Sequence, residues 1–211
     1  TFYMKYLSVP ELETYVSEFN CLESMESRLF GVVELFSLKL AGDDKQLYHS
    51  LNKSYESFAL SPTNLSVSPF GPLTESSSRK ILISLVTTLQ HVYPCYDFSE
   101  VRASDFTKEP NFGVAFNYIN STIVPSFPKF SENNLQNSMW DVMQSYIHFE
   151  DCDIYRFSPS SDLDPLADAL WSFHYFFYNK ELKRVLFFSA GAKLKTEFDD
   201  DDEMMDDIDP Y

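Results

Sequence analysis

The chain has 211 residues, of which 44% are hydrophobic and 17% aromatic, and its formal net charge is −16. This apolar content excludes disorder over most of the chain, and the length is sufficient for one sizeable core. The negative charge disfavours direct binding of DNA through neutralisation of its phosphates. It favours a basic protein as the partner, or a protein that itself binds nucleic acid.

Several other kinds of site find no support in the sequence. Only 5 glycines occur, and neither GxGxxG nor GxxxxGK followed by Ser or Thr is present, which argues against a glycine-rich phosphate loop. There is no apolar run of about eighteen residues and no signal-like start, so we expect no membrane-spanning helix and no secretory signal. Three cysteines without CxxC spacing favour reduced thiols in a cytosolic or nuclear protein. We expect no cofactor.

Residues 1–59 are expected to form an N-terminal block of helix, strand and helix. Ser8 and Glu11 have the spacing of a capping box, which predicts a helix near 9–20. The β-branched and aromatic content of residues 29–40 predicts a strand. One face of that strand would carry Phe30, Val32, Phe36, Leu38 and Leu40, with Glu34 as the exception. A second helix would carry an apolar stripe formed by Leu47, Leu51, Tyr55 and Phe58.

Residues 60–78 differ in character, because Pro and Ser dominate and hydrophobic periodicity is lost. This composition predicts a linker between the N-terminal block and the rest of the chain. The Ser-Pro steps at Ser61 and Ser68 permit two interpretations. Either the segment is an exposed loop without regulation, or these serines are phosphorylated by a proline-directed kinase, each phosphate adding about −1.5 to −2 charges.

Residues 79–190 are expected to complete one globular domain together with the N-terminal block. Helical periodicity predicts three helices, near 78–91, 110–122 and 132–148. A strand is expected at 152–157, and the aromatic segment 93–98 is expected to be extended, as a packed loop or as a strand. Strands and helices are interspersed without regular alternation, which predicts the α+β class with a central, mostly antiparallel sheet flanked by helices.

Residues 171–188 predict a central β-hairpin with a turn at Asn179 and Lys180. This turn places Tyr175 opposite Arg184, and a four-residue loop from 178 to 181 gives the same register. The other pairs on that face are Phe177 with Leu182, Phe173 with Leu186 and Trp171 with Phe188. We expect this face to supply the structural core, through Trp171, Phe173, Tyr175 and Phe177, with a cation–π contact between Tyr175 and Arg184.

The opposite face of the hairpin is mixed in character. We therefore expect helices or loops to cover it only in part, leaving Phe176, Glu181 and Lys183 partly exposed. His174 lies on this strand among aromatic side chains and is interpreted as a packed structural histidine. The hairpin would act chiefly as a scaffold.

Residues 191–211 form an acidic tail that we expect to be disordered. Its segment 197–209, EFDDDDEMMDDID, holds nine acidic and no basic side chains. Such a tail would engage a positively charged surface of a partner, with an affinity that falls as the salt concentration rises. Its candidate contact residues are Asp199, Asp200, Asp201 and Asp202.

The candidates for catalysis are two aspartate pairs at a spacing of two, Asp151 with Asp153 and Asp162 with Asp164. Paired carboxylates can serve acid–base or Mg²⁺ chemistry. Surface solvation or helix capping accounts for them equally well, and no further residue completes a site. We therefore expect neither enzymatic activity nor a metal site.

Five sequence blocks follow one another along the chain. They are LKLAGDDKQLYHS (38–50), SSRKILISLVTTL (77–89), YPCYDFS (93–99), DCDIYRFSP (151–159) and LWSFHYFFYNKELKRVLFF (170–188). They resemble, in order, the blocks of the Maf-one family, eukaryotic negative regulators of transcription by RNA polymerase III. The resemblance covers most of residues 4–190, and the last block is highly specific.

The resemblance implies a single α/β body with a central sheet, no catalysis, and binding to RNA polymerase III and its Brf-containing initiation factor. It also implies control by kinases and phosphatases, with phosphorylated protein held inactive, and hence shuttling between nucleus and cytoplasm. Ser61 and Ser68 resemble the Ser-Pro positions of the family's linker. The linker here is short, and it lacks an arginine-rich kinase site and a strong basic import run.

We therefore expect a repressor that acts by occupancy and blocks assembly of the preinitiation complex. Its candidate contacts outside the tail are Lys39, Asp43, Asp44, Lys45, Lys180, Lys183 and Arg184. A solvated face accounts equally well for each of these charges. Two alternatives remain open: an acidic interaction scaffold or histone-type chaperone for basic proteins, and a hydrolase that uses the aspartate pairs.

Overall fold

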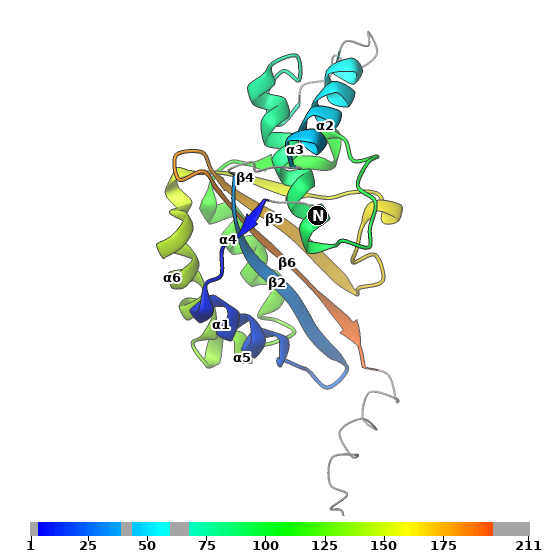
Figure 1. Cartoon of the computed structure of the whole chain (residues 1–211). Helices are drawn as coiled ribbons and strands as arrows, with labels where there is room; N and C mark the ends of the chain where they lie inside the picture. Colours follow the sequence, from blue (N-terminus) through cyan, green and yellow to red (C-terminus); the bar gives the residue numbers. More distant parts are fainter. Residues whose placement is uncertain (1–3, 39–43, 60–67, 196–211) are drawn as a thin grey trace, which may run out of the picture.

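The sheet predicted from the sequence is present and has six strands. The computed structural model describes residues 4–38, 44–59 and 68–195. In spatial order the strands are β1 (Lys5–Tyr6), β2 (Ser27–Ser37), β6 (Arg184–Leu194), β5 (Trp171–Asn179), β4 (Cys152–Phe157) and β3 (Phe106–Glu109), each antiparallel to its neighbours (Figure 1). The α+β class is confirmed. The sequence does not predict β1 or β3, because such short strands show no period of two.

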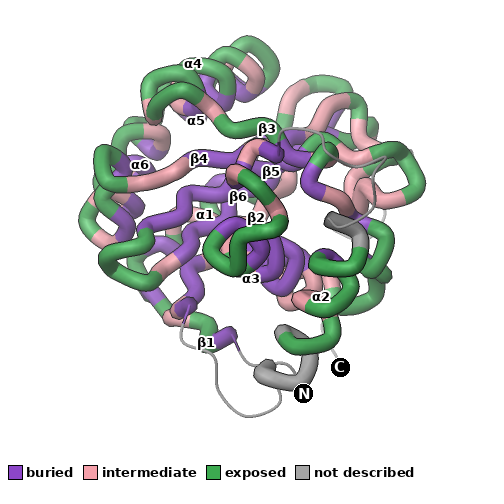
Figure 2. The backbone as a smooth tube through the Cα atoms, turned by 90° about the horizontal axis from the view of Figure 1, so that it is seen from above, coloured by how far each residue is buried: buried purple, intermediate pink, exposed green. Residues whose placement is uncertain are grey.

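Helices cover both faces of this sheet. One face is covered by α1 (Pro10–Asn20), α4 (Phe112–Ile123), α5 (Lys129–Glu132) and α6 (Leu135–Ile147). The other face is covered by α3 (Ser76–Val92), and α2 (Asp44–Ala59) packs on α3, further from the sheet (Figure 1). Figure 2 shows that buried positions concentrate in the central strands and in α3. Short 3₁₀ turns are η2 (Ala103–Asp105), η3 (Phe149–Asp151) and η4 (Ser161–Leu163).

The helices expected near 9–20, 78–91 and 110–122 are confirmed, whereas two details differ. The helix expected at 132–148 begins only at Leu135, because Asn134 has a φ of 60° and interrupts the helical backbone. The capping box of Ser8 and Glu11 is not formed. Pro10 takes the first helical position, where its missing N–H costs nothing, and the Ser8 hydroxyl donates instead to Glu13 at 2.8 Å.

Both faces of the paired strands are buried, so the expectation that Phe176 is partly exposed is wrong, whereas Glu181 and Lys183 are exposed in the loop, as expected. Phe173, Tyr175 and Phe177 are buried against α4 and α6, and Trp171 is half-buried at the edge of that core. Phe176, on the opposite face, is fully buried as well. The physical reason is α3, whose apolar stripe covers this second face with Leu82, Leu85, Val86 and Leu89. Strands buried on both faces show continuous apolar runs, as β5 does.

The hairpin register also differs from the expected one. Tyr175 lies opposite Phe188 and Asn179 opposite Arg184, so the loop is Lys180–Lys183. The Asn179 side chain accepts the backbone N–H of Leu182 at 2.9 Å and closes this loop. The expected cation–π contact is absent, because Tyr175 faces a phenylalanine. The shift is an even number of residues, and therefore the same aromatic side chains still share the core face.

β2 is buried on both faces, which corrects the single apolar face expected for it. Leu29, Val33 and Leu35 are buried on the face opposite to Phe30 and Val32, which are only half-buried. Of the two forms expected for the segment 93–98, the packed loop is present, since the segment forms turns and Phe98 is buried. In α2, Tyr55 is buried and Leu51 is half-buried, as the predicted stripe requires, whereas the Phe58 side chain lies outside the described part.

The expected segment boundaries shift at two places. Residues 68–75 pack on the body instead of forming a free linker, since Phe70 is buried with its ring centroid 4.8 Å from that of Tyr155. β6 continues to Leu194, so the expected start of the tail at residue 191 falls inside the strand. Residues 60–67, including Ser61, and residues 196–211 lie outside the described residues.

Glu34 on β2 supplies a pH test of the sheet. Burial raises the pKa of its carboxyl group, so the folded state binds this proton more tightly than the unfolded chain does. The folded protein therefore loses stability as pH rises from the unfolded pKa, about 4.3, through the folded one. We expect Glu34→Gln to raise the melting temperature at pH 7 and to have no effect near pH 3.

Thermal unfolding followed by circular dichroism at several pH values measures this difference. Glu26→Gln in the exposed turn before β2 serves as the control and should not change the melting temperature. Destabilisation of the Glu34→Gln variant at pH 7 would show that the ionised carboxylate is favourable in the fold.

Candidate interaction surface at the hairpin tip

The tip of the β5–β6 hairpin, residues 180–184, is fixed to the end of α6. The buried Asn179 side chain donates to the carbonyl oxygen of Ile147 at 2.8 Å. Arg184 Nη1 donates to the carbonyl oxygen of Tyr146, also at 2.8 Å. Carbonyl groups at a helix C-terminus carry partial negative charge, so a guanidinium there is stabilising. The two ends of the tip are therefore anchored to α6.

The end of β2 reaches the same place. Ser37 pairs with Arg184, and the N–H of Leu38 donates to the carbonyl oxygen of Lys183 at 2.8 Å. The chain therefore leaves the sheet at the hairpin tip when it enters the first of the resembling blocks. The side chains of Lys180 and Lys183 are exposed there, whereas Arg184 is half-buried by its contact with α6.

The other predicted contact residues are placed only in part. Lys39 and Asp43 lie outside the described residues. Asp44 and Lys45 begin α2, although their side chains also lie outside the description. The structure thus brings Leu38, where the first block begins, next to the hairpin lysines. The positions of the charged side chains within that block stay a prediction.

The acidic tail leaves the domain far from the hairpin tip. β6 starts at Arg184 in the tip and ends at Leu194, and its 11 residues span about 35 Å at roughly 3.3 Å each (Figure 1). Next to its end, Lys195 Nζ forms an ion pair with Glu23 at 2.7 Å. Asp199, Asp200, Asp201 and Asp202 lie outside the described residues. The tip and the origin of the tail are therefore separated by the full length of a strand.

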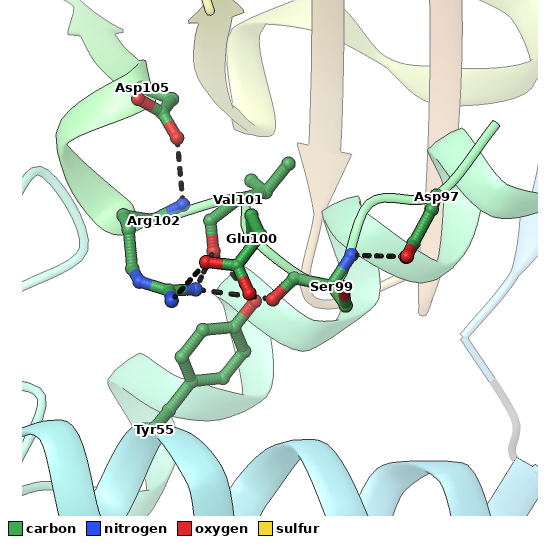
Figure 3. Close-up of polar contacts among 7 residues, drawn as sticks. All are labelled: Tyr55, Asp97, Ser99, Glu100, Val101, Arg102 and Asp105. Carbon is green, nitrogen blue, oxygen red and sulfur yellow. Dashed lines mark hydrogen bonds and ion pairs between the residues drawn. The ribbon is translucent and has the colours of Figure 1, made fainter. Parts of the chain in front are cut away.

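The docking of α2 depends on the loop that follows α3. Tyr55 is buried, and its hydroxyl donates to the carbonyl oxygen of Val101 at 3.1 Å (Figure 3). Burial raises the pKa of Tyr55 to about 12. The loop is folded by its own polar groups: Arg102 Nη1 donates to the carbonyl oxygens of Ser99 and Val101, and Asp97 accepts the N–H of Ser99. The block YPCYDFS thus helps to shape the surface on which α2 rests.

Arg79 is the second anchor of α2, and sequence reasoning missed it. Its side chain is nearly inaccessible, and residue Arg79 is only 5% exposed. Nε donates to Asn52 of α2 at 2.8 Å, and Nη1 donates to the carbonyl oxygens of Leu73 and Thr74 at 2.7 and 2.8 Å. The available signal is spacing, because position 79 continues the apolar stripe of 82, 83 and 86 at helical intervals.

On the sheet face that α3 covers, four residues distant in the sequence form a buried hydrogen-bond network. Asp164 Oδ1 lies 3.0 Å from His174 Nε2, and His174 Nδ1 lies 2.8 Å from Ser189 Oγ. The Tyr93 hydroxyl lies 2.8 Å from the same serine oxygen. Partial burial opposes ionisation of Asp164, but hydrogen bonds from His174 and the Leu166 N–H prevail and lower its carboxyl pKa.

This order of acid, imidazole and hydroxyl is that of a hydrolase triad, but its geometry is unsuited to catalysis. His174 and Ser189 are each 1% exposed, and the Tyr93 hydroxyl occupies the position beside the serine oxygen. A substrate carbonyl has no access to that oxygen. The network instead ties the end of α3 and the loop before β5 to the sheet, in agreement with the interpretation of His174 as structural.

The predicted aspartate pairs do not form a common carboxylate site. Asp153 forms an ion pair with Lys108 at 2.6 Å, Asp164 bonds to His174, and Asp151 and Asp162 are exposed. Across residues 4–38, 44–59 and 68–195, no three His, Cys, Asp or Glu side chains are grouped as metal ligands. Within the same ranges, every helix is too short or too polar to cross a bilayer.

Comparison with known proteins identifies the family. The model of the Maf1 regulator family matches residues 29–189. The chain belongs to the Maf1 family. This is the Maf-one family that the five blocks resemble, and the resemblance is therefore confirmed.

Relatives and solved structures agree with this assignment. The "Repressor of RNA polymerase III transcription maf1" of Schizosaccharomyces pombe is 35% identical, over 88% of this chain and 82% of its own length. The "Repressor of RNA polymerase III transcription" of Dictyostelium discoideum is 30% identical, over 96% of this chain and 90% of its own length. A crystal structure of citrus MAF1 matches with a TM-score of 0.70 and 31% identity, over 89% of this chain and 99% of that one. The α+β fold is that of the Maf1 family.

Proposed function

We propose that this chain represses transcription by RNA polymerase III by occupying the polymerase and its Brf-containing initiation factor, so that the two cannot join. The observation that carries this proposal is the membership of the Maf1 family, together with the names of the two relatives, which align with most of the chain. We propose no catalytic step, because the Asp164–His174–Ser189 group is closed to substrate. Repression would then follow from binding alone.

The hairpin tip is the proposed contact for an acidic patch of the partner. Lys180 and Lys183 are exposed on a loop whose ends Asn179 and Arg184 fix to α6. The entropy cost of binding at this loop therefore comes mainly from ordering the two lysine side chains. Charge complementarity of this kind mainly accelerates association. The acidic tail, which starts at the other end of β6, would contact a separate basic surface.

Phosphorylation is proposed to control this activity and, with it, shuttling between nucleus and cytoplasm. Of the two Ser-Pro candidates, Ser68 is 8% exposed, and its hydroxyl accepts the N–H of Phe70 at 3.2 Å. A kinase would therefore reach Ser68 only after the segment 68–70 opens. Ser61 lies in the part of the linker outside the described residues, and its phosphorylation is proposed from the Ser61-Pro62 step alone.

Charge reversal at the tip tests the proposed contact. In a reconstituted assay, the wild-type protein should inhibit transcription of a tRNA gene and leave a polymerase II promoter unaffected. We expect Lys180→Glu with Lys183→Glu to raise the concentration needed for half-inhibition about tenfold, which corresponds to about 1.4 kcal/mol of binding free energy. Lys53→Glu with Lys80→Glu changes the same charge at exposed positions on α2 and α3 and should have little effect.

Each part of the proposal fails separately in this assay. If the wild-type protein does not inhibit the tRNA gene selectively, the proposed function is wrong. If both double variants inhibit like the wild type, the function stands but the tip is not the contact. Ser61→Asp and Ser68→Asp should weaken inhibition if the linker is the switch. Deletion of 197–211 should weaken inhibition, whereas it should abolish binding of basic proteins by an acidic scaffold.

A further inference from the structure

One helix on the surface of this acidic protein carries no charge. Between Glu109 and Lys129 the sequence contains no Asp, Glu, Lys, Arg or His, and this stretch includes the whole of α4. Yet α4 is not buried on all sides, since Val114 and Tyr118 are each 41% exposed. A surface helix normally carries charged residues toward water. Depletion of charge is instead typical of the core of a protein–protein interface. On the α4 side the groove described next is lined by the half-buried Phe112 and Phe116. Val114 and Tyr118 are not in its lining, and the Tyr118 ring faces the Arg156 guanidinium at 5.4 Å.

An aromatic groove lies beside this helix, between α4 and α6. Its volume is about 530 Å³, and it is lined by Phe112, Phe116, Asn134, Asn137, Trp140, Asp141, Gln144 and Phe149. The aromatic side chains hold its shape: the Phe112 and Phe149 rings are stacked with centroids 4.2 Å apart, and Phe116 and Trp140 are 5.1 Å apart. Trp140 is fixed further by its Nε1–H bond to Asn120 at 3.2 Å. The groove is therefore preformed.

Two carboxylates lie at the groove, and the titratable His148 is close enough to Glu150 to help lower its carboxyl pKa. Asp141 lines it and is exposed, and Glu150 is exposed next to it, bound by Gln144 Nε2 at 2.7 Å. The eight lining residues include no cation. An occupant that fits would place an apolar side chain on the aromatic floor and a positive charge near these carboxylates. Asn137 Nδ2 donates to Asn134 Oδ1 at 2.9 Å, and the remaining donors and acceptors of these two amides offer polar contacts to a peptide backbone.

We propose that the α4–α6 groove is a docking site for a polypeptide segment that carries an aliphatic or aromatic side chain next to lysine or arginine. Charge complementarity with Asp141 and Glu150 selects this segment over an acidic one. The site is separate from the basic hairpin tip, which selects an acidic partner surface. It therefore goes beyond the proposed function and stands whether or not the tip contacts the polymerase.

The probe for this site is the peptide acetyl-Lys-Leu-Phe-Leu-Lys-amide, titrated into the full-length chain. The protein has 2 tryptophans, so its ¹H–¹⁵N spectrum contains two indole signals, which Trp171→Phe assigns. We expect the Trp140 indole signal to shift and saturate while that of Trp171 stays in place. Asp141→Asn should weaken binding at least threefold, and Asn137→Arg, which fills the groove and adds a cation, at least tenfold.

The controls separate the groove from general attraction to an acidic protein. Asp168→Asn removes an exposed carboxylate elsewhere and should leave the affinity for the peptide unchanged. All variants retain the acidic tail, so any attraction of the peptide to the tail is the same in each. The peptides acetyl-Lys-Ser-Ser-Ser-Lys-amide and acetyl-Glu-Leu-Phe-Leu-Glu-amide should not shift Trp140. Equal binding of the serine peptide, or a Trp140 signal that stays fixed at millimolar peptide, overturns the proposal. So does a dimer in sedimentation that Asn137→Arg dissociates, because the occupant is then a second copy.

Discussion

Replacement of Phe177 by alanine should lower the free energy of unfolding by about 3–5 kcal/mol. The ring is fully buried at the centre of the hairpin, and its centroid lies 4.8 Å from that of Phe149 and 6.3 Å from that of Trp140. Removing it leaves a cavity that aromatic neighbours on both α6 and η3 cannot easily fill. Because native domains are stable by only about 5–15 kcal/mol, the variant should be largely unfolded in mild urea.

Urea unfolding followed by circular dichroism measures this loss. Met25→Ala is the control: Met25 is 96% exposed, so its truncation should change stability by less than about 0.5 kcal/mol. The same large loss is expected for Phe173→Ala, whereas Trp171→Ala should cost less because Trp171 is only half-buried. A loss below about 1 kcal/mol for Phe177→Ala would contradict the central position of the hairpin.

The second large effect is expected at Arg79. Arg79→Met keeps the length of the side chain but removes the donors that Asn52, Leu73 and Thr74 accept. Two backbone carbonyls beneath α2 would then lose their partners, and hydrogen bonds to charged groups are worth about 1.5–3 kcal/mol each. We expect a loss of about 2–4 kcal/mol that appears first as local opening of α2.

Hydrogen exchange distinguishes local opening from global unfolding. Amides of α2 should lose protection in Arg79→Met well before those of β5 do. Lys80→Met, at the next and exposed position of α3, should leave the protection of α2 unchanged. If α2 keeps its wild-type protection in Arg79→Met, then the Tyr55–Val101 contact suffices to hold the helix.

Features that depend on hydrophobic periodicity could be predicted from the sequence. Features set by an even shift of strand register, or by contacts between distant residues, could not. The apolar stripe of α3 and the core face of β5 follow from spacing alone. The hairpin register does not, because an even shift leaves every side chain on its face. The loop is selected by bonds such as that from Leu182 to Asn179 and those that join Asn179 and Arg184 to α6. The hydrogen bond that the Asn179 side chain makes in the turn therefore helps to set the register, which periodicity alone does not predict.

The same distinction applies to the sites. The exposure of Lys180 and Lys183 is predicted because a turn between two apolar strands lies at the surface, whereas their contact role stays a proposal. Arg79 is missed because a charged residue is expected at the surface, although its position on the stripe indicates burial. The contact of Tyr93 with Ser189 joins residues 96 positions apart, and no local pattern encodes it. The α4–α6 groove likewise depends on how two helices pack.

The position of β6 has a mechanical consequence. It lies between β2 and β5 and pairs with both along nearly its whole length, and the acidic segment continues directly from it. A pull on the C-terminus, such as an unfolding motor would apply, therefore loads two antiparallel ladders in shear at once. At the other end of the chain, β1 pairs through only two residues on the sheet edge and would peel away first. Extraction from the C-terminus thus meets the strongest part of the molecule at its first step.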